Sequence, residues 1–296
     1  RWGRGVWCFG SYSRMCVLWP APSAASSSPW QARRAFVLAA AAGAAAPALA
    51  QVEVGSASGM RRLVPAETLE SSATQQYSQL LAQARAQGAL VPSGHPQLAR
   101  LHAIARRLIP FTTPWNDRAR HWRWEVNLIA SKQINAFCMP GGKIAFFTGI
   151  LDQLRLTDDE AAMIMGHEMA HALREHARER LAKTQATNLG LRLGAQLLGL
   201  GDVGQLAANL GGQLLTLKFS RGDESEADLV GLELAARAAF QPAASVSLWQ
   251  KMGQATGGKD GLAFLSTHPS GPDRIRELQQ NVPKVQGLYE AARQNG

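Results

Sequence analysis

The chain has 296 residues, of which 46% are hydrophobic, enough to form a core in one large domain or two small ones. Its formal charge of +9 suggests an anionic partner, but five arginines of that excess lie in the first 50 residues, which contain no acidic residue. The rest holds 26 basic and 22 acidic residues, a net charge of +4, with no basic cluster interleaved with aromatics. This balance argues against nucleic acid as a partner.

Residues 1–50 have the pattern of a secretory leader. The pair Arg33-Arg34 precedes an alanine-rich apolar stretch, and Ala-Leu-Ala before Gln51 fits a signal-peptidase site. We therefore predict a mature chain that starts near Gln51 and a periplasmic protein, exported by a general or a twin-arginine signal. A retained membrane anchor is the less favoured alternative, because the stretch is short. The Trp-, Ser- and Pro-rich residues 1–30 suggest a mis-assigned translation start.

After a linker at 51–65, we expect a single domain at 66–296. Its first part, 66–115, is polar with apolar residues at helical spacing. This pattern predicts one helix at 66–88 and a second helix at 95–110.

The second part of the domain, 120–280, is predicted to begin with a small sheet. Residues 122–131, WRWEVNLIAS, alternate as a strand does. Residues 134–151, INAFCMPGGKIAFFTGIL, indicate two strands about the turn Pro140-Gly141-Gly142. Together with the flanking helices, this sheet indicates a mostly helical α+β fold.

A long helix follows the sheet. Thr157 and Glu160 form a Thr-x-x-Glu capping box, which predicts a helix that begins at Asp158. The helical pattern continues to about Lys183. His176 lies nine residues after the first histidine of this helix, roughly 180° around it, so we expect a surface or packing histidine there.

The apolar half of this helix carries His167, Glu168 and His171. Four residues are about 400° of helical rotation, so the two imidazoles project from one face and can bind a single zinc ion. Glu168, beside the first histidine, is placed to take a proton from an attacking water. The apolar run AAMIMG before the motif indicates a core position, unlike a chance His-Glu-x-x-His on a solvated helix.

Two histidines leave zinc short of the usual three protein ligands. A second amphipathic helix, predicted at 223–240, presents Glu224 and Asp228 four residues apart on one face. Glu224 could complete a His-His-Glu site, with Asp228 holding a ligand histidine by its free N–H. Glu226 remains an alternative ligand on spacing alone.

The segment 188–220 is apolar and glycine-rich but interrupted by charges and amides, which make a membrane span costly. We expect two packed helices that cover the site and could serve as its lid. A hairpin in peripheral contact with a membrane is the alternative. A last helix is predicted at 272–282.

Four motifs in this order resemble the gluzincin metallopeptidases related to HtpX, BepA, LoiP, Oma and the CAAX prenyl protease. They are INAFCMPGGKIAFFTGIL, His-Glu-Met-Ala-His, Glu-Ser-Glu-Ala-Asp after FSRGD, and STHPSGPDRI. The resemblance implies a gluzincin fold with an edge strand beside the active-site helix and one zinc ion per chain. It also implies Glu224 as the third ligand, with Asp228 as its companion.

The same resemblance suggests how a substrate is bound. The edge strand that binds the substrate backbone falls on Asn135 and Ala136, as an unpaired strand edge can bind any extended peptide. His268 and Arg274 fall on the family's His-Pro loop. His268 would then either stabilise the oxyanion of the tetrahedral intermediate or cap the zinc in a resting state. A loop histidine held by Pro269 is the alternative.

These residues together predict a zinc endopeptidase of the short, exported branch of the family. Its expected partners are misfolded or misassembled envelope proteins, bound as extended strands, with Glu168 as general base and then proton donor. The alternative function is a chaperone or assembly factor that binds the same strands and rarely cuts. An intact base favours the enzyme, because binding alone has no need of Glu168.

Overall fold

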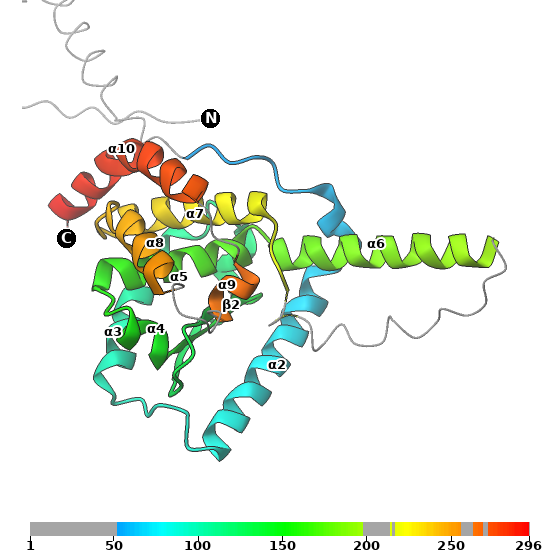
Figure 1. Cartoon of the computed structure of the whole chain (residues 1–296), viewed down its shortest axis with the longest axis horizontal. Coiled ribbons are helices and arrows are strands. Elements are labelled where there is room, and N and C mark those ends of the chain that lie inside the picture. Colours follow the sequence, from blue (N-terminus) through cyan, green and yellow to red (C-terminus); the bar gives the residue numbers. More distant parts are fainter. Residues whose placement is uncertain (1–51, 198–213, 215–216, 256–262, 269–271, 296) are drawn as a thin grey trace, which may run out of the picture. The chain divides into compact units, whose positions relative to one another are not determined.

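The computed structural model (Figure 1) describes residues 52–197, 214, 217–255, 263–268 and 272–295, with α6 described by its backbone alone beyond Ala186. All of them belong to one unit, 49–296. The leader predicted at 1–50 and most of the predicted lid lie outside the described residues.

Helices dominate the described residues, and a small sheet lies among them, so the predicted α+β class is confirmed. The helices are α2 (Ala66–Ala86), α3 (Pro96–Leu108), α4 (Thr148–Gln153), α5 (Asp158–Leu173), α6 (His176–Leu197), α7 (Arg221–Arg237), α8 (Ala244–Ala255), α9 (Ala263–Thr267) and α10 (Pro272–Asn295). Short 3₁₀ turns are η1 (Gly59–Leu63), η2 (Ile109–Phe111) and η3 (Asp117–His121).

The sheet has three strands, β1 (Glu125–Ile129), β2 (Ala136–Met139) and β3 (Lys143–Phe147), in the order β1-β3-β2. β1 runs parallel to β3, and β2 runs antiparallel to it. The turn between β2 and β3 needs glycine, because Gly141 and Gly142 have φ angles of 84° and 77°, which side chains disfavour. Because β2 lies at the end of the strand order β1-β3-β2, it is an edge strand of this sheet, as predicted.

The start of α5 follows from its sequence. The hydroxyl of Thr157 accepts the backbone N–H of Glu160 at 3.2 Å, and the Glu160 carboxylate accepts the backbone N–H of Thr157 at 2.9 Å. This is the predicted capping box, and the helix begins at Asp158 as expected. Its carboxylates in the first turn also suit the positive end of the helix dipole.

The end of α5 differs from the prediction of one helix to Lys183. α5 stops before Arg174, and a new helix starts at His176. Between them Glu175 has a φ of 59°, a left-handed conformation that the sequence does not announce with glycine. Its carboxylate lies 3.0 Å from Nη1 of Arg178 and 3.3 Å from Nε of Arg61. A tertiary ion pair with Arg61 and a local one with Arg178 thus support the break.

α5 and α7 pack directly against each other (Figure 1, green and yellow). At their crossing two glycines meet. A Cβ on Gly231 would lie 2.6 Å from the backbone N of His167, and a Cβ on Gly166 would lie 2.9 Å from the carbonyl O of Gly231. Only hydrogen-sized groups fit there, so the two helix backbones approach closely. This approach brings the histidines of α5 against the carboxylates of α7.

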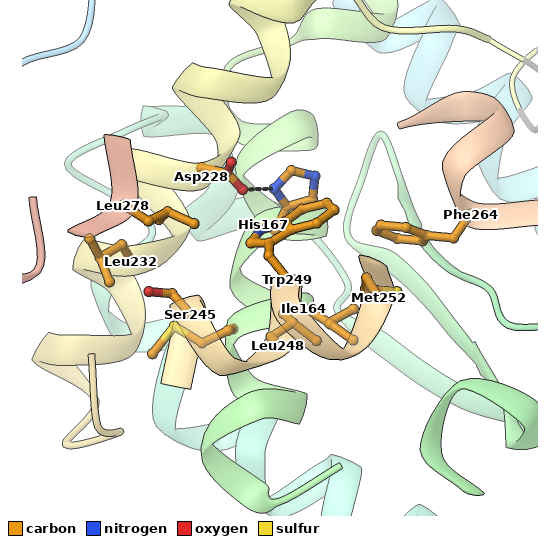
Figure 2. Close-up of a pocket in the computed structure, with 11 residues that line it drawn as sticks. Ile164, His167, Asp228, Leu232, Ser245, Leu248, Trp249, Met252, Phe264 and Leu278 are labelled. Atoms are coloured by element: carbon orange, nitrogen blue, oxygen red, sulfur yellow. Dashed lines mark hydrogen bonds and ion pairs between the residues drawn. The ribbon is translucent and has the colours of Figure 1, made fainter. Parts of the chain in front are cut away.

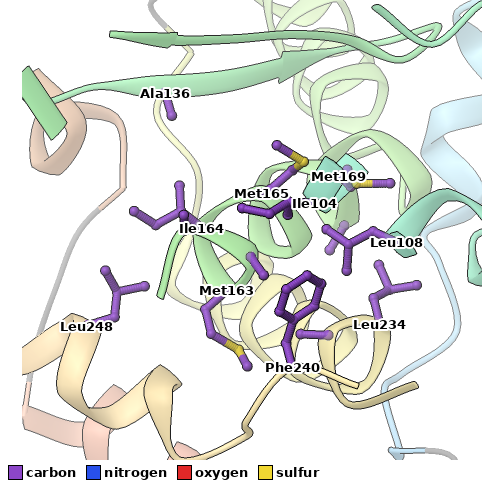
Figure 3. Packing of buried hydrophobic residues seen from close by; sticks show 14 of the residues in the cluster. Ile104, Leu108, Ala136, Met163, Ile164, Met165, Met169, Leu234, Phe240 and Leu248 are labelled. Carbon is purple, nitrogen blue, oxygen red and sulfur yellow. The ribbon is translucent and has the colours of Figure 1, made fainter. Parts of the chain in front are cut away.

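α5 is the centre of the main hydrophobic core (Figure 3). Met163, Met165 and Met169 point from it toward side chains that include Leu108 of α3 and Phe240 after α7. These residues are all at least 96% buried. A helix so enclosed can hold polar side chains only if they are paired.

Some elements differ from the sequence-based expectation. α4, α8 and α9 were not predicted, and α10 extends the helix predicted at 272–282 to Asn295. α8 buries Leu248, Trp249 and Met252 at helical spacing, a readable signal. Among the described residues, no helix has the length and hydropathy needed to cross a membrane.

Candidate metal centre

Four segments converge on one buried cluster of polar side chains. α5 supplies His167, Glu168 and His171, α7 supplies Glu224 and Asp228, the turn after α9 supplies His268, and α10 supplies Arg274.

Four of these side chains form a group of donor atoms that could hold a metal ion. The Nε2 atom of His167 lies 3.1 Å from Nε2 of His171 and 3.3 Å from Nδ1 of His268. The Glu224 carboxylate lies 3.4 Å from Nε2 of His171 and 3.0 Å from Nδ1 of His268. Zinc with ligands at about 2.0–2.1 Å has tetrahedral edges of about 3.3 Å. The donor set therefore fits zinc in both chemistry and spacing.

The charges of Glu224 and His171 suit metal binding, whereas at His167 burial lowers the pKa but Asp228 and Glu224 raise it to about 9, so a metal must displace a proton there. Burial raises the pKa of Glu224, but the imidazoles of His167, His171 and His268 beside it outweigh burial and hold that pKa far below its usual range. Burial also lowers the pKa of His171 well below its usual value, with Glu224 opposing. Glu224 is thus an anion and His171 a neutral imidazole, the forms that ligate a metal.

His167 is held from behind by Asp228. Its Nδ1 donates to the Asp228 carboxylate at 2.9 Å (Figure 2), which directs Nε2 toward the donor group. Arg274 donates hydrogen bonds from Nε and Nη2 to the two carboxylate oxygens of Asp228 at 2.7 and 2.8 Å. Its Nη1 lies 2.6 Å from the Glu224 carboxylate. Burial raises the pKa of Asp228, but Arg274 and His167 lower it overall. The guanidinium stacks on Trp249, 3.7 Å from the ring centre.

The side chain of Glu168 lines the space between α5 and strand β2. Its Oε1 is buried and makes no hydrogen bond within the part of the chain that the structure describes, with Nε2 of His268 3.5 Å away. Burial raises the pKa of this carboxyl above its usual value. A desolvated carboxylate with a free oxygen and a raised pKa is suited to accept a proton near neutral pH.

A cleft of ≈ 50 Å³ separates β2 from the donor group. Asn135 and Ala136 line it beside Glu168 and His268, so the structure brings the predicted peptide-binding residues next to the candidate metal site. The Asn135 side chain accepts the backbone N–H of Ala136 at 3.0 Å, and this contact shapes the start of the strand. Phe219 adds an aromatic wall on the opposite side.

His268 is held in the cluster by its neighbours. Its ring stacks on Phe264 at 4.4 Å between centres, and its backbone N–H donates to the Phe264 carbonyl. A second cavity, of ≈ 20 Å³, lies behind His167 and is walled by Trp249, Phe264 and Leu278 (Figure 2). It has room for about one water and is mostly apolar.

His176 is a packing histidine, one of the two outcomes expected for it, but the expectation that it faces away from the metal ligands is wrong. It is 98% buried, and its Nδ1 lies 2.9 Å from Nδ1 of His171. A position 180° from His167 requires one continuous helix. The helix breaks at Glu175, whose left-handed backbone turns His176 back toward the candidate ligands. Glu226, the alternative ligand, lies outside the donor group and contacts His176 at 2.9 Å instead. The sequence held no local signal for this arrangement.

The fold and the donor set together define a metallopeptidase-type centre. The profile of Peptidase family M48 matches residues 95–282, and the chain belongs to this family.

Individual relatives agree. The mitochondrial metalloendopeptidase OMA1 of Schizosaccharomyces pombe is 38% identical over 200 residues, 67% of this chain and 56% of the relative. The metalloprotease LoiP of Escherichia coli is 30% identical over 51% of this chain and 60% of its own length. The β-barrel assembly-enhancing protease of Yersinia pestis is 28% identical over 53% and 34%. The chain thus matches from about a third to three fifths of these relatives' lengths.

The predicted periplasmic location is wrong on this comparison. The OMA1 relatives from fungi, a plant and mammals, at 31–38% identity, are named as mitochondrial proteins. A leader that is rich in arginine and serine and free of acidic residues also has the composition of an organelle transit peptide. The composition of residues 1–50 therefore does not distinguish a secretory signal from an organelle transit peptide.

Proposed function

We propose that the chain is a zinc-dependent endopeptidase with one zinc ion per chain, ligated by His167, His171 and Glu224. The observation that carries this proposal is the buried donor group at tetrahedral spacing beside a carboxylate oxygen that lacks a hydrogen bond. The names of the relatives, metalloendopeptidases and metalloproteases, support the same activity and do not favour a chaperone without proteolysis.

Bound zinc supplies a Lewis acid that polarises the peptide carbonyl and lowers the pKa of water toward 7. Glu168 takes the proton of the attacking water through its free Oε1 and passes it to the leaving amine. Asp228 keeps His167 in the Nδ1–H tautomer, and Arg274 holds the carboxylates of Asp228 and Glu224 in place.

His268 takes part in the resting state. Its Nδ1 stands among the donor atoms, and a catalytic zinc site needs one open position for water or substrate. Of the two roles considered for this residue, the position supports the cap. Displacement of His268 would then leave its Nε2–H beside the cleft, free to face a developing oxyanion.

The substrates we propose are unfolded or misassembled proteins that offer extended segments. β2 is an edge strand that lines the cleft, and an edge strand binds the backbone of a peptide with little regard to its side chains. The name of the Yersinia pestis relative, which refers to β-barrel assembly, is in keeping with misassembled substrates.

The test is cleavage of unfolded casein by the zinc-loaded full chain beside Glu168→Gln at equal zinc content. We expect cleavage by the first protein alone, because glutamine cannot accept the proton. Equal cleavage by both would reject Glu168 as the base, and zinc binding with no cleavage of any unfolded protein would reject the peptidase.

A further inference from the structure

The two histidines of α5 differ in what lies behind them. His167 donates its Nδ1–H directly to a carboxylate. Within the described part of the chain no carboxylate contacts Nδ1 of His171, and its partner there is Nδ1 of His176, 2.9 Å away. The other nitrogen of His176, Nε2, lies 2.9 Å from the Glu226 carboxylate. An imidazole is thus inserted between a proposed ligand and its carboxylate.

With a metal at Nε2 of His171 and one proton on each ring, one arrangement of protons satisfies this chain of contacts. Nε2 of His171 faces the donor group, so its ring proton is on Nδ1, which must donate to His176. Nδ1 of His176 then accepts, so the proton of that ring is on Nε2 and is donated to Glu226. In this arrangement each imidazole donates outward, and the Glu226 carboxylate is the last acceptor.

Glu226 is in turn fixed by Arg174. Nε and Nη2 of Arg174 reach its two oxygens at 3.0 and 2.9 Å, a bidentate contact. The same guanidinium donates to the carbonyl of Gly55, in the extended segment before η1. The outer end of the chain of contacts is therefore anchored, through Arg174, to the body of the protein.

His171 is also confined on its face. The ring of Phe219 stacks on it with 3.9 Å between ring centres and 29° between ring planes. Stacking fixes the plane of the imidazole, but it leaves open which edge points to the donor group. The contact at Nδ1 decides this, so the two contacts are complementary.

We propose that His176 is a positioning residue for His171, and that Glu226 and Arg174 act through it to hold the ligand imidazole for zinc. The inference rests on the proposed zinc site. This arrangement differs from that at His167. Asp228 contacts the ligand His167 directly, whereas Glu226 contacts His176, which in turn contacts the ligand His171.

The first experiment measures the zinc dissociation constant of the full chain by competition with a chromophoric chelator. His176→Leu removes the acceptor for His171, and we expect zinc binding to weaken by roughly 10- to 100-fold, as for other partners of metal ligands. His176→Asn keeps an acceptor oxygen near the position of Nδ1, and we expect it to recover most of the affinity. A weakening of His176→Asn equal to that of His176→Leu contradicts the proposal.

Leu181→Ala is the matched control. Leu181 is buried on the same helix, one and a half turns from His176, and lies in a separate apolar cluster. It should lower the melting temperature without changing the zinc dissociation constant. If Leu181→Ala weakens zinc binding as much as His176→Leu, the effect of His176 is general destabilisation and the proposal fails.

A measurement on the unaltered protein avoids dependence on the folding of variants. Long-range ¹H–¹⁵N spectra of the zinc-loaded chain should show His176 protonated at Nε2 and bare at Nδ1. The opposite tautomer would overturn the inference while leaving the zinc site intact. Failure of the unaltered chain to bind zinc at all would instead remove the proposed function.

Discussion

The two walls of the cleft are built on different principles. One wall is formed by Glu168 and His171 of α5 and is backed by the buried carboxylates of α7, over a crossing where two glycines meet. The β2 wall presents main-chain groups of an edge strand, with Phe137 and Cys138 beside them. For the proposed peptidase we therefore expect high selectivity for the metal ion, which fixed side chains would bind, and low selectivity for the peptide, which an open backbone would bind.

The largest expected effect is on the metal-holding wall. Glu168→Gln should lower kcat for an unfolded protein by roughly 10²- to 10⁴-fold, because a positioned general base contributes about this much. KM and zinc content should stay nearly constant, since the residue neither ligates nor lies on β2. Steady-state kinetics with metal analysis checks this, and a change in KM alone would move Glu168 to substrate binding.

The glycine contact comes next. Gly231→Ala places a Cβ 2.6 Å from the backbone of α5, so the helices must separate, at a cost of about 1–3 kcal/mol in the free energy of unfolding. Gly253→Ala in α8 is the control, because a Cβ there meets no atom within 4 Å. That variant should gain about 0.5–1 kcal/mol from helix propensity. Denaturant titration of both variants measures the difference. Equal free energies of unfolding would show that the close approach of α5 and α7 at Gly231 does not restrict side-chain size.

The peptide-holding wall should respond to changes in the substrate backbone. N-methylation of one amide that pairs with β2 removes one hydrogen bond of about 0.5–1.5 kcal/mol and should raise KM by about 2- to 10-fold. A side-chain change at the same position should matter less. A methylation scan along a cleaved peptide tests this, and uniform tolerance of N-methyl groups would argue against strand pairing.

The smallest effect concerns the outer carboxylate Glu226. Its pKa is lowered to about 2, so its contribution to stability is present above about pH 4.5 and is lost as the pH falls toward 2. In metal-free protein, Glu226→Gln should therefore be less stable than the unaltered chain at pH 6. The gap should close by about pH 2.5 in thermal melts. A constant gap across this range would show that the charge of Glu226 does not stabilise the fold.

The sequence predicts what is decided locally. The capping box of Thr157 and Glu160 set the start of α5 correctly, because both hydrogen bonds lie within one turn. The turn at Gly141 and Gly142 was readable for the same reason, since a left-handed backbone there requires glycine. Helical spacing also placed Glu224 and Asp228 on one face of α7.

What the sequence could not give depends on distant partners. The break at Glu175 relies on ion pairs with Arg61 and Arg178, more than a hundred residues from the former. Without the break, His176 was assigned to the wrong side of the helix. Spacing alone likewise left Glu224 and Glu226 as rival ligands, because only the packing of α7 on α5 decides which carboxylate faces the histidines.

The contact between Gly166 and Gly231 also bears on which metal ions the site can hold. It sets the separation of α5 and α7 by main-chain contact, so the span between their ligand atoms does not adapt to the ion as flexible side chains would. Calcium, with six to eight oxygen ligands at about 2.3–2.6 Å, needs a wider and more oxygen-rich shell than two or three imidazoles on so short a span can form. In the proposed zinc site, discrimination between ions would thus begin at two residues that have no side chains.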